Sequence, residues 1–295
     1  MTDGGSGSNH GTGAGPARAR TPRALTIAGS DSGGGAGIQA DLKAFARCGV
    51  HGMSAITAVT AQSTTGVRSI HAVPPEMVLD QVRAVVADIG VDAVKVGMLG
   101  GAETIAAVAQ ALDELPPGTP IVGDPVMVAE CGGRLLEEGA ERALIEQIVP
   151  RATVLTPNLP EARVLSARAD GPSEEGEDEE SEAERLAAAV LALGAAAVVL
   201  TGGHRSRAVD LLLDSSGDAG VVRIEGPRHP DGAAHGSGCT HSAVLAAQLA
   251  LGRPLLEAAR IAQAMAAEAV ANGLRDVGEG AGPVDVIGLA AIRRG

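Results

Sequence analysis

Ala24-Leu25-Thr26-Ile27-Ala28-Gly29 is a short run of β-forming residues, and a glycine-rich segment from Ser30 to Gly37 follows it directly. Ile38, Leu42 and Phe45 then recur at helical spacing. The order strand, glycine loop and helix is typical of the first unit of an α/β domain. A dinucleotide-binding fold is less favoured, because no acidic residue ends a second strand about twenty residues further on, where a ribose contact needs one.

The same alternation continues along the chain. Further strands are expected at 53–61, 92–96, 120–122, 153–155 and 196–200, with an antiparallel hairpin at 208–213 and 220–225. Helices are expected at 75–89, 103–115, 139–149, 183–193, 242–251 and 255–271. This pattern predicts one α/β domain over residues 23–295, with a mainly parallel sheet covered by helices on both faces. Ligands of such sheets bind outside the carboxyl ends of the strands.

Two segments lie outside this pattern. Residues 1–22 are of low complexity and are expected to form a disordered tail. Ser173 to Glu184 holds eight carboxylates and no basic residue, so we expect a solvated, flexible acidic loop at 170–183. Unspaced carboxylates of this kind favour contact with solvent rather than a metal site.

The composition excludes several classes of protein. The 295 residues include one Phe and no Trp or Tyr, so stacking platforms for single-stranded nucleic acid are absent. A net charge of −13 disfavours binding to nucleic acid or to an anionic membrane. Cys48, Cys131 and Cys239 are too few and too scattered for a disulfide framework or a zinc site. With no signal-like or membrane-spanning segment in the sequence, we expect a cytoplasmic location.

A second glycine-rich stretch, His235-Gly236-Ser237-Gly238-Cys239-Thr240, runs directly into an apolar helix. The free N–H groups at such a helix start form an anion-binding site that suits phosphate. The helix dipole is also expected to lower the pKa of Cys239 and to make a thiolate available. The alternative is an ordinary helix start that carries a buried cysteine.

Polar residues at other strand ends add to this site. Asp124 follows an expected strand and suits Mg²⁺ or a water bound to it. Asn158 and Glu161 lie three residues apart in a proline-bounded turn, where they either face one ligand or form a helix capping box. Gly202-Gly203 allows close approach of a nucleotide, or is simply a turn. Together these parts predict phosphoryl transfer.

Several motifs occur in an order that resembles a known family. They are Thr26 to Asp31, Gly34 to Lys43, Ala55 to Gln62, Lys95 to Leu99, Asp124 to Met127, Thr156 to Ala162 and His235 to Thr240. The chain resembles the hydroxymethylpyrimidine/phosphomethylpyrimidine kinases of thiamine biosynthesis over roughly residues 24 to 285. The resemblance implies a three-layer α/β/α ribokinase-like fold and a homodimer. It also implies ATP and Mg²⁺ as cofactors, with a monovalent cation left open, and two successive phosphorylations of 4-amino-5-hydroxymethyl-2-methylpyrimidine.

The resemblance also assigns residues. Gln62 would hydrogen-bond the aminopyrimidine, in a pocket lined by Gly29, Asp41, Met98 and Val126. The nucleotide would be bound by Asn158, Glu161, Thr201, Gly203 and Ser237, and the metal by Asp124 and Glu161. Catalysis would fall to Cys239 with Gly236, Ser237 and Gly238. Asp41 can instead be a first-turn carboxylate that favours the helix dipole, and Met98 a core filler.

Three departures from the family pattern concern these roles. Thr201 stands where the family often has a phosphate-contacting lysine, Ser237 replaces a threonine, and Ala233 and Ala234 replace polar residues. Two alternatives to the pyrimidine kinase follow. One is a pyridoxal kinase of the same scaffold, and the other is a non-catalytic binder of the pyrimidine.

Overall fold

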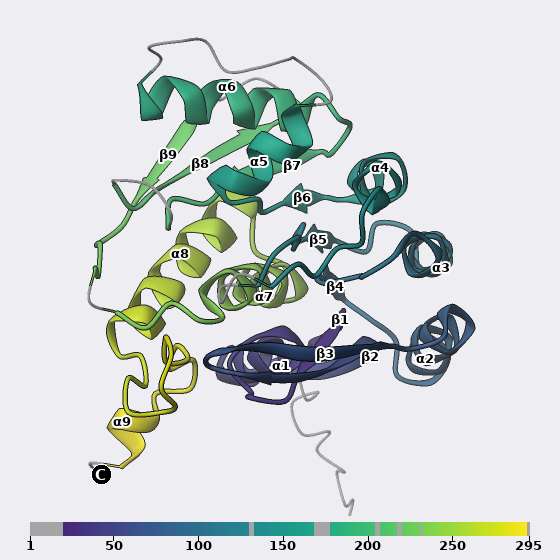
Figure 1. Ribbon diagram of the computed structural model, residues 1–295. Coiled ribbons are helices and arrows are strands. Elements are labelled where there is room, and N and C mark those ends of the chain that lie inside the picture. Colours follow the sequence, from purple (N-terminus) through teal and green to yellow (C-terminus); the bar gives the residue numbers. More distant parts are fainter. Residues whose placement is uncertain are drawn as a thin grey trace, which may run out of the picture.

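The computed structural model describes residues 20–129, 133–167, 178–203, 207–216, 220–230 and 232–293. Within these ranges nine strands form one sheet in the order β3-β2-β1-β4-β5-β6-β7-β8-β9 (Figure 1). The strands are β1 (Arg23–Asp31), β2 (His51–Ser63), β3 (Gly66–Ala72), β4 (Ala93–Val96), β5 (Ile121–Gly123), β6 (Val154–Leu155), β7 (Ala197–Leu200), β8 (Val209–Asp214) and β9 (Val222–Glu225). The six strands from β2 to β7 in this order are parallel, and β3, β8 and β9 are attached by antiparallel pairings.

Helices cover both faces of the sheet, which confirms the three-layer prediction (Figure 1). One face packs against α1 (Gly37–Arg47), α7 (Ser237–Ala250) and α8 (Leu255–Ala271). The other packs against α2 (Pro75–Asp88), α3 (Ala102–Asp113), α4 (Ala140–Ala143), α5 (Leu159–Ser166) and α6 (Glu179–Leu191). A short helix, α9 (Leu289–Ile292), lies near the C-terminus.

The strands contact both helix layers because their successive side chains point to opposite faces of the sheet. In β7, Ala197 and Val199 pack toward α7 and α8, whereas Val198 and Leu200 pack toward the opposite helices. Such strands are buried on both faces, so most of their residues are apolar, as is typical of parallel sheets. The core consists mainly of Ala, Val, Leu and Ile side chains, with Phe45 fully buried among them.

Two elements differ from the sequence prediction. Strand β3 was not predicted, because it is an edge strand with mostly exposed side chains and so lacks the expected alternation of apolar and polar residues. The helix expected at 139–149 is divided into α4, a π-helical turn at Leu144–Ile148 and a 3₁₀ turn at Val149–Arg151. Pro150 has no N–H to continue the helical bonding, which is consistent with the end of the helix here.

The acidic loop prediction was wrong for its second half. Residues 168–177 lie outside the described ranges, but Asp178 is the N-cap of α6, where its side chain accepts two backbone N–H groups. Glu182 forms two hydrogen bonds with Arg163, at 2.7 and 2.8 Å. The carboxylates of the first turn of α6 are favoured by the helix dipole, so this part of the acidic run is helical rather than a loop. Likewise, residues 1–19 of the expected tail lie outside the described ranges, and Arg20 pairs with Asp92.

Asp178→Ala is expected to lower the melting temperature by a few degrees, because it removes the acceptor for two N–H groups at the start of α6. Asp178→Asn keeps an acceptor and serves as the matched control, with a melting temperature near wild type. Equal losses in the two variants, measured by calorimetry, would contradict the capping role.

No helix in the described ranges combines the length and apolar character needed to cross a bilayer.

Candidate active site

A cavity of about 380 Å³ lies beyond the carboxyl ends of the parallel strands, between them and the start of α7. Its position agrees with the expectation for an open α/β sheet. The sequence-predicted site residues on its wall are Gly29, Gln62, Met98, Asp124, Val126, Asn158, Glu161, Thr201, Gly203, Gly236, Ser237, Gly238 and Cys239. The fold therefore brings together residues from the start, middle and end of the chain.

Asp41 is the exception, and its predicted place in the pocket wall is corrected. Its side chain is fully buried behind the cavity, where Oδ2 accepts a hydrogen bond of 2.6 Å from Thr26 Oγ1. Nor does it lie in a first helical turn, because α1 begins four residues earlier, at Gly37. Asp41 instead contacts Lys95 Nζ at 3.1 Å.

Lys95 is a central residue of the site that the sequence analysis did not single out. Its Nζ lies 3.1 Å from Asp41 Oδ2 and 3.4 Å from Asp124 Oδ2, and its side chain is fully buried. Burial alone would lower the pKa of Lys95, but the charges of Asp41 and Asp124 and the hydrogen bond to Asp41 oppose burial, and the pKa lies above its usual value. The sequence does contain a signal for this role: Lys95 interrupts the otherwise apolar run Ala93–Val96, and a buried lysine needs a partner of opposite charge.

The start of α7 has the geometry of an anion site. Gly236 precedes the helix with a φ of 86°, and a Cβ there would lie 1.8 Å from the carbonyl oxygen of Gly35. Only glycine is compatible with both conditions. In the first turn that follows, the N–H groups of Gly238 and Cys239 have no acceptor within the helix. They are available to a phosphoryl group in the cavity.

Cys239 lies in the first turn of α7 as predicted, but the expected fall in its pKa is wrong. Burial raises the pKa of Cys239 to about 12; the charge of Lys95 opposes this rise, and the carboxylates of Asp124 and Asp41 add to it. The helix dipole does not offset burial beside two carboxylates. Cys239 is therefore a neutral thiol at pH 7.

Asp124 accepts a hydrogen bond of 2.9 Å from Ser242 Oγ in addition to its contact with Lys95. Its side chain reaches the cavity wall. No cluster of three or more metal-ligating side chains occurs within the described ranges.

Asn158 and Glu161 form the capping box that was one of the two predicted alternatives. Asn158 Oδ1 accepts from the Glu161 backbone N–H at 2.9 Å, and Glu161 Oε2 accepts from the Asn158 N–H at 3.0 Å. Both residues also line the cavity, beside Thr201, which forms a β-bridge with Asn158. The capping box fixes both side chains at the mouth of the site.

A buried chain of contacts that the sequence did not predict joins α7 to the turn after β7. The Gly202 N–H donates to Asp210 Oδ1 at 2.7 Å, and Asp210 Oδ2 lies 3.1 Å from His241 Nε2. Gly202 also contacts β8 closely, since a Cβ there would lie 2.4 Å from the Val209 nitrogen. Gly202 is thus a structural turn residue, and Gly203 is the one on the cavity wall.

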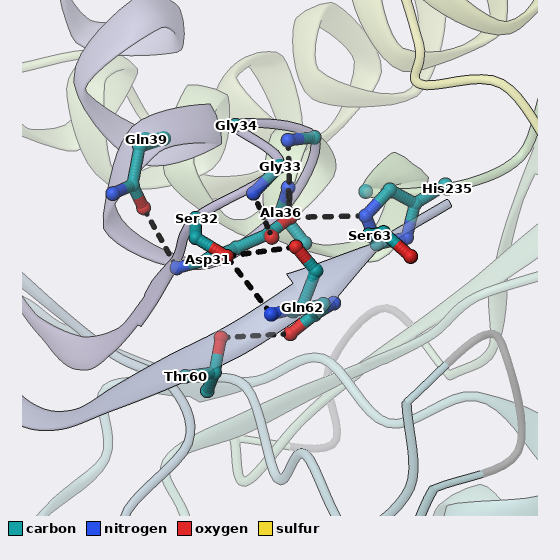
Figure 2. Close-up of polar contacts among 12 residues, drawn as sticks. Asp31, Ser32, Gly33, Gly34, Ala36, Gln39, Thr60, Gln62, Ser63 and His235 are labelled. Carbon is teal, nitrogen blue, oxygen red and sulfur yellow. Dashed lines mark hydrogen bonds and ion pairs between the residues drawn. The ribbon is translucent and has the colours of Figure 1, made fainter. Parts of the chain in front are cut away.

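Asp31 organises the glycine loop after β1 (Figure 2). Its carboxylate accepts backbone N–H groups from Gly33, Gly35 and Ala36 at 2.8 to 3.0 Å and lies 3.0 Å from His235 Nε2. Burial alone would raise the pKa of Asp31, but hydrogen bonds from His235 and the backbone hold the pKa below its usual value. An aspartate just before a glycine-rich turn is a recognisable signal, because its side chain can accept from the turn's backbone.

Gln62 lies at the opposite side of this loop, near the end of β2. Its Oε1 is 3.2 Å from Thr60 Oγ1, and its side chain lines the cavity. With the amide oxygen beside a hydroxyl, the amide nitrogen remains as a donor for a ligand.

Comparisons with known proteins agree with this arrangement. Residues 31–285 match the family model described as phosphomethylpyrimidine kinase. A hydroxymethylpyrimidine/phosphomethylpyrimidine kinase of Rhizobium meliloti is 48% identical over 267 residues, which cover 90% of this chain and 96% of that protein.

Two solved structures are similar over most of the chain. A pyridoxal kinase from Staphylococcus aureus in complex with AMP-PCP and pyridoxal has a TM-score of 0.77 at 33% identity, covering 91% of this chain and 94% of its own. A phosphomethylpyrimidine kinase from Clostridium difficile has a TM-score of 0.69 at 36% identity, covering 82% and 96%. Because the family model matches residues 31–285 and a family relative is 48% identical over 267 residues, the chain belongs to the phosphomethylpyrimidine kinase family.

Proposed function

We propose that this protein transfers the γ-phosphate of ATP to 4-amino-5-hydroxymethyl-2-methylpyrimidine and then to the resulting monophosphate, as a step of thiamine biosynthesis. The observation that carries the proposal is the placement of Gln62 and Cys239 on one cavity wall, in a chain of this family. Gln62 suits the hydrogen-bonding edge of the pyrimidine, and Cys239 suits the hydroxyl group that reacts.

The pyrimidine is assigned to the end of the cavity near Gln62, with Gly29, Met98 and Val126 around the ring. A primary amide supplies both a donor and an acceptor, which match the ring nitrogen and the exocyclic amine of an aminopyrimidine. The nucleotide is assigned to the end formed by Asn158, Glu161, Thr201, Gly203 and Ser237. The hydroxymethyl group then faces the start of α7.

In this arrangement the N–H groups of Gly238 and Cys239 stabilise the phosphoryl group during transfer. Cys239 takes the proton of the hydroxymethyl group. Because the pKa of Cys239 is about 12, its thiolate is a small fraction of the protein at neutral pH. The positive charge of Lys95 stabilises the thiolate and so increases this fraction.

Mg²⁺ is the cation proposed for this reaction. Asp124 and Glu161 both reach the cavity, and Mg²⁺ in phosphate sites takes one or two carboxylates together with phosphate oxygens. The donor set therefore fits. The ion would neutralise charge on the phosphates, while Asp124 also holds the Lys95 ammonium in place.

A pyridoxal kinase is the second candidate, because solved pyridoxal kinases share this fold at TM-scores near those of the pyrimidine kinase. Pyridoxal lacks the aminopyrimidine edge that matches Gln62, and this difference favours the pyrimidine. The third candidate, a non-catalytic binder of the pyrimidine, is suggested by Thr201 in place of lysine. It is disfavoured because the family is one of kinases. We further propose a cytoplasmic homodimer that binds neither nucleic acid nor membranes, in keeping with its net charge of −13.

The test is incubation of the protein with ATP, Mg²⁺ and the pyrimidine alcohol, followed by separation of mono- and diphosphate products. Both products are expected, and turnover of pyridoxal under the same conditions is expected to be lower. ATP consumption that does not depend on either alcohol would contradict both kinase assignments.

Gln62→Leu is expected to weaken binding of the pyrimidine by roughly 2–4 kcal/mol, because the ligand's amine and ring nitrogen would be left unpaired in an enclosed site. Calorimetric titration of the wild type and the variant with the pyrimidine alcohol measures this loss. Affinity for ATP is the internal control and should remain within twofold of wild type. Unchanged affinity for the pyrimidine would remove Gln62 from the recognition site.

A further inference from the structure

We infer that one six-residue turn, residues 31–36, sets the pyrimidine-binding end and the phosphate-binding end of the cavity relative to each other, with Ser32 positioning Gln62 and Asp31 positioning the start of α7 (Figure 2). The inference rests on the proposed function of the cavity. Asp31 and Ser32 are thereby assigned positioning roles at the two ends of the cavity.

The contact between Ser32 and Gln62 is reciprocal. Ser32 Oγ donates to the Gln62 carbonyl oxygen at 2.7 Å and accepts from the Gln62 N–H at 2.8 Å. The Ser32 hydroxyl thus takes the place of the backbone N–H and C=O groups that a neighbouring strand would offer to Gln62. The last backbone pair between β1 and β2 is Asp31 with Thr60, so this side chain extends the pairing by one further step.

Gln62 needs this contact because its backbone lies at an irregular place in the sheet. The β2–β3 register shifts between Ala61 and Gln62. A shift of this kind disrupts the local ladder and re-aims the side chains near it. Ser32 holds the Gln62 backbone on one side, and Thr60 Oγ1 donates to Gln62 Oε1, so both the backbone and the amide oxygen of Gln62 are held in place.

The same turn holds the other end of the site through Asp31 and Gly35. Asp31 Oδ2 lies 3.0 Å from His235 Nε2, in a pair of which both side chains are buried. His235 directly precedes Gly236, which packs against the carbonyl of Gly35 so closely that a Cβ would lie 1.8 Å away. The turn therefore contacts both residues that lead into the anion site at Gly238 and Cys239.

Two neighbouring residues of the turn thus fix two groups that are more than 170 positions apart in the chain. Phosphoryl transfer depends on alignment of the attacking oxygen with the phosphoryl group, and small displacements are costly. Ser32 is expected to act on the binding of the pyrimidine, and Asp31 on the rate of transfer. This division distinguishes positioning from a general structural role.

Ser32→Ala is expected to raise KM for the pyrimidine by about tenfold, with kcat, KM for ATP and the melting temperature near wild type. Ser32→Thr keeps the hydroxyl and should restore KM. In a Gln62→Leu background, Ser32→Ala should add little, because Ser32 acts through Gln62. Ser63→Ala is the matched control, since Ser63 lies in the same hairpin but bonds Thr65 instead of the turn.

Asp31→Asn is expected to lower kcat at least tenfold with KM for the pyrimidine within threefold of wild type. His235→Gln should give the same split if Asp31→Asn does not fold, and the double variant should be no worse than either single one. If the wild type phosphorylates the pyrimidine but Ser32→Ala leaves its KM unchanged, or alters both KM values equally, the inference is overturned. An inactive wild type would instead overturn the proposed function.

Discussion

Cys239→Ala is expected to lower kcat of the first phosphorylation by about a hundred- to ten-thousand-fold, which is the usual contribution of a general base. Affinity for ATP should stay close to wild type, because the N–H groups of the first turn of α7 remain in place. The second phosphorylation uses a phosphate oxygen that is already ionised, so it needs no base and should fall much less. Both steps can be measured on one preparation by product analysis after rapid quenching.

The pH dependence of the first step gives an independent check. Burial raises the pKa of Cys239 to about 12, so below that value the thiolate fraction rises tenfold for each pH unit. The first-step rate of the wild type should therefore increase between pH 6 and 9, and the second-step rate should lack this increase. Cys239→Ala should abolish the difference between the two profiles.

Cys48→Ala is the matched control, because Cys48 lies at the end of α1 and not on the cavity wall. It should leave both phosphorylations unchanged. Equal losses of both steps in Cys239→Ala would mean that Cys239 shapes the anion site and does not take a proton. Retention of the first step would exclude it from the mechanism.

Lys95→Met is expected to lower the free energy of unfolding by about 3–5 kcal/mol, the cost of leaving a buried charge without its partner. The Lys95 ammonium contacts both Asp41 and Asp124, and without it these two buried carboxylates would lose the cation between them. Urea unfolding of the wild type and the variant at pH 8 measures this loss.

The loss should shrink as the pH falls. Burial already raises the pKa of Asp41 above its usual value, and removal of Lys95 takes away the charge that opposes this rise. A carboxyl group with a raised pKa in the folded state favours folding below its unfolded pKa and loses that contribution as the pH rises. The variant should thus be closer to wild type at pH 5 than at pH 8.

Lys95→Met combined with Asp41→Asn should recover part of the stability, because the double variant no longer buries the Asp41 charge. Lys43→Met is a surface-side control, since Lys43 donates to the Gly34 carbonyl but pairs with no buried carboxylate among the described residues. A loss below about 1 kcal/mol at pH 8 in Lys95→Met would show that the cluster is not held by this ammonium.

Local sequence determined much of the fold. The repeated order of apolar strand and amphipathic helix predicted the parallel sheet, and α8 has the predicted bounds of 255–271. Asn158 and Glu161 could be foreseen as a capping box because both partners lie within one helical turn. The polar residues at the strand ends meet in one cavity because the carboxyl ends of parallel strands share one edge of the sheet.

The chemistry within that cavity was decided by tertiary structure. Asp41 and Lys95 are 54 residues apart, and Asp31 and His235 are 204 apart, so no local pattern pairs them. The sequence placed Cys239 at a helix start and so predicted a lowered pKa, whereas the fold encloses the thiol beside two carboxylates and raises the pKa. Periodicity and capping depend on neighbours along the chain; burial and charge pairing depend on which side chains the fold brings together.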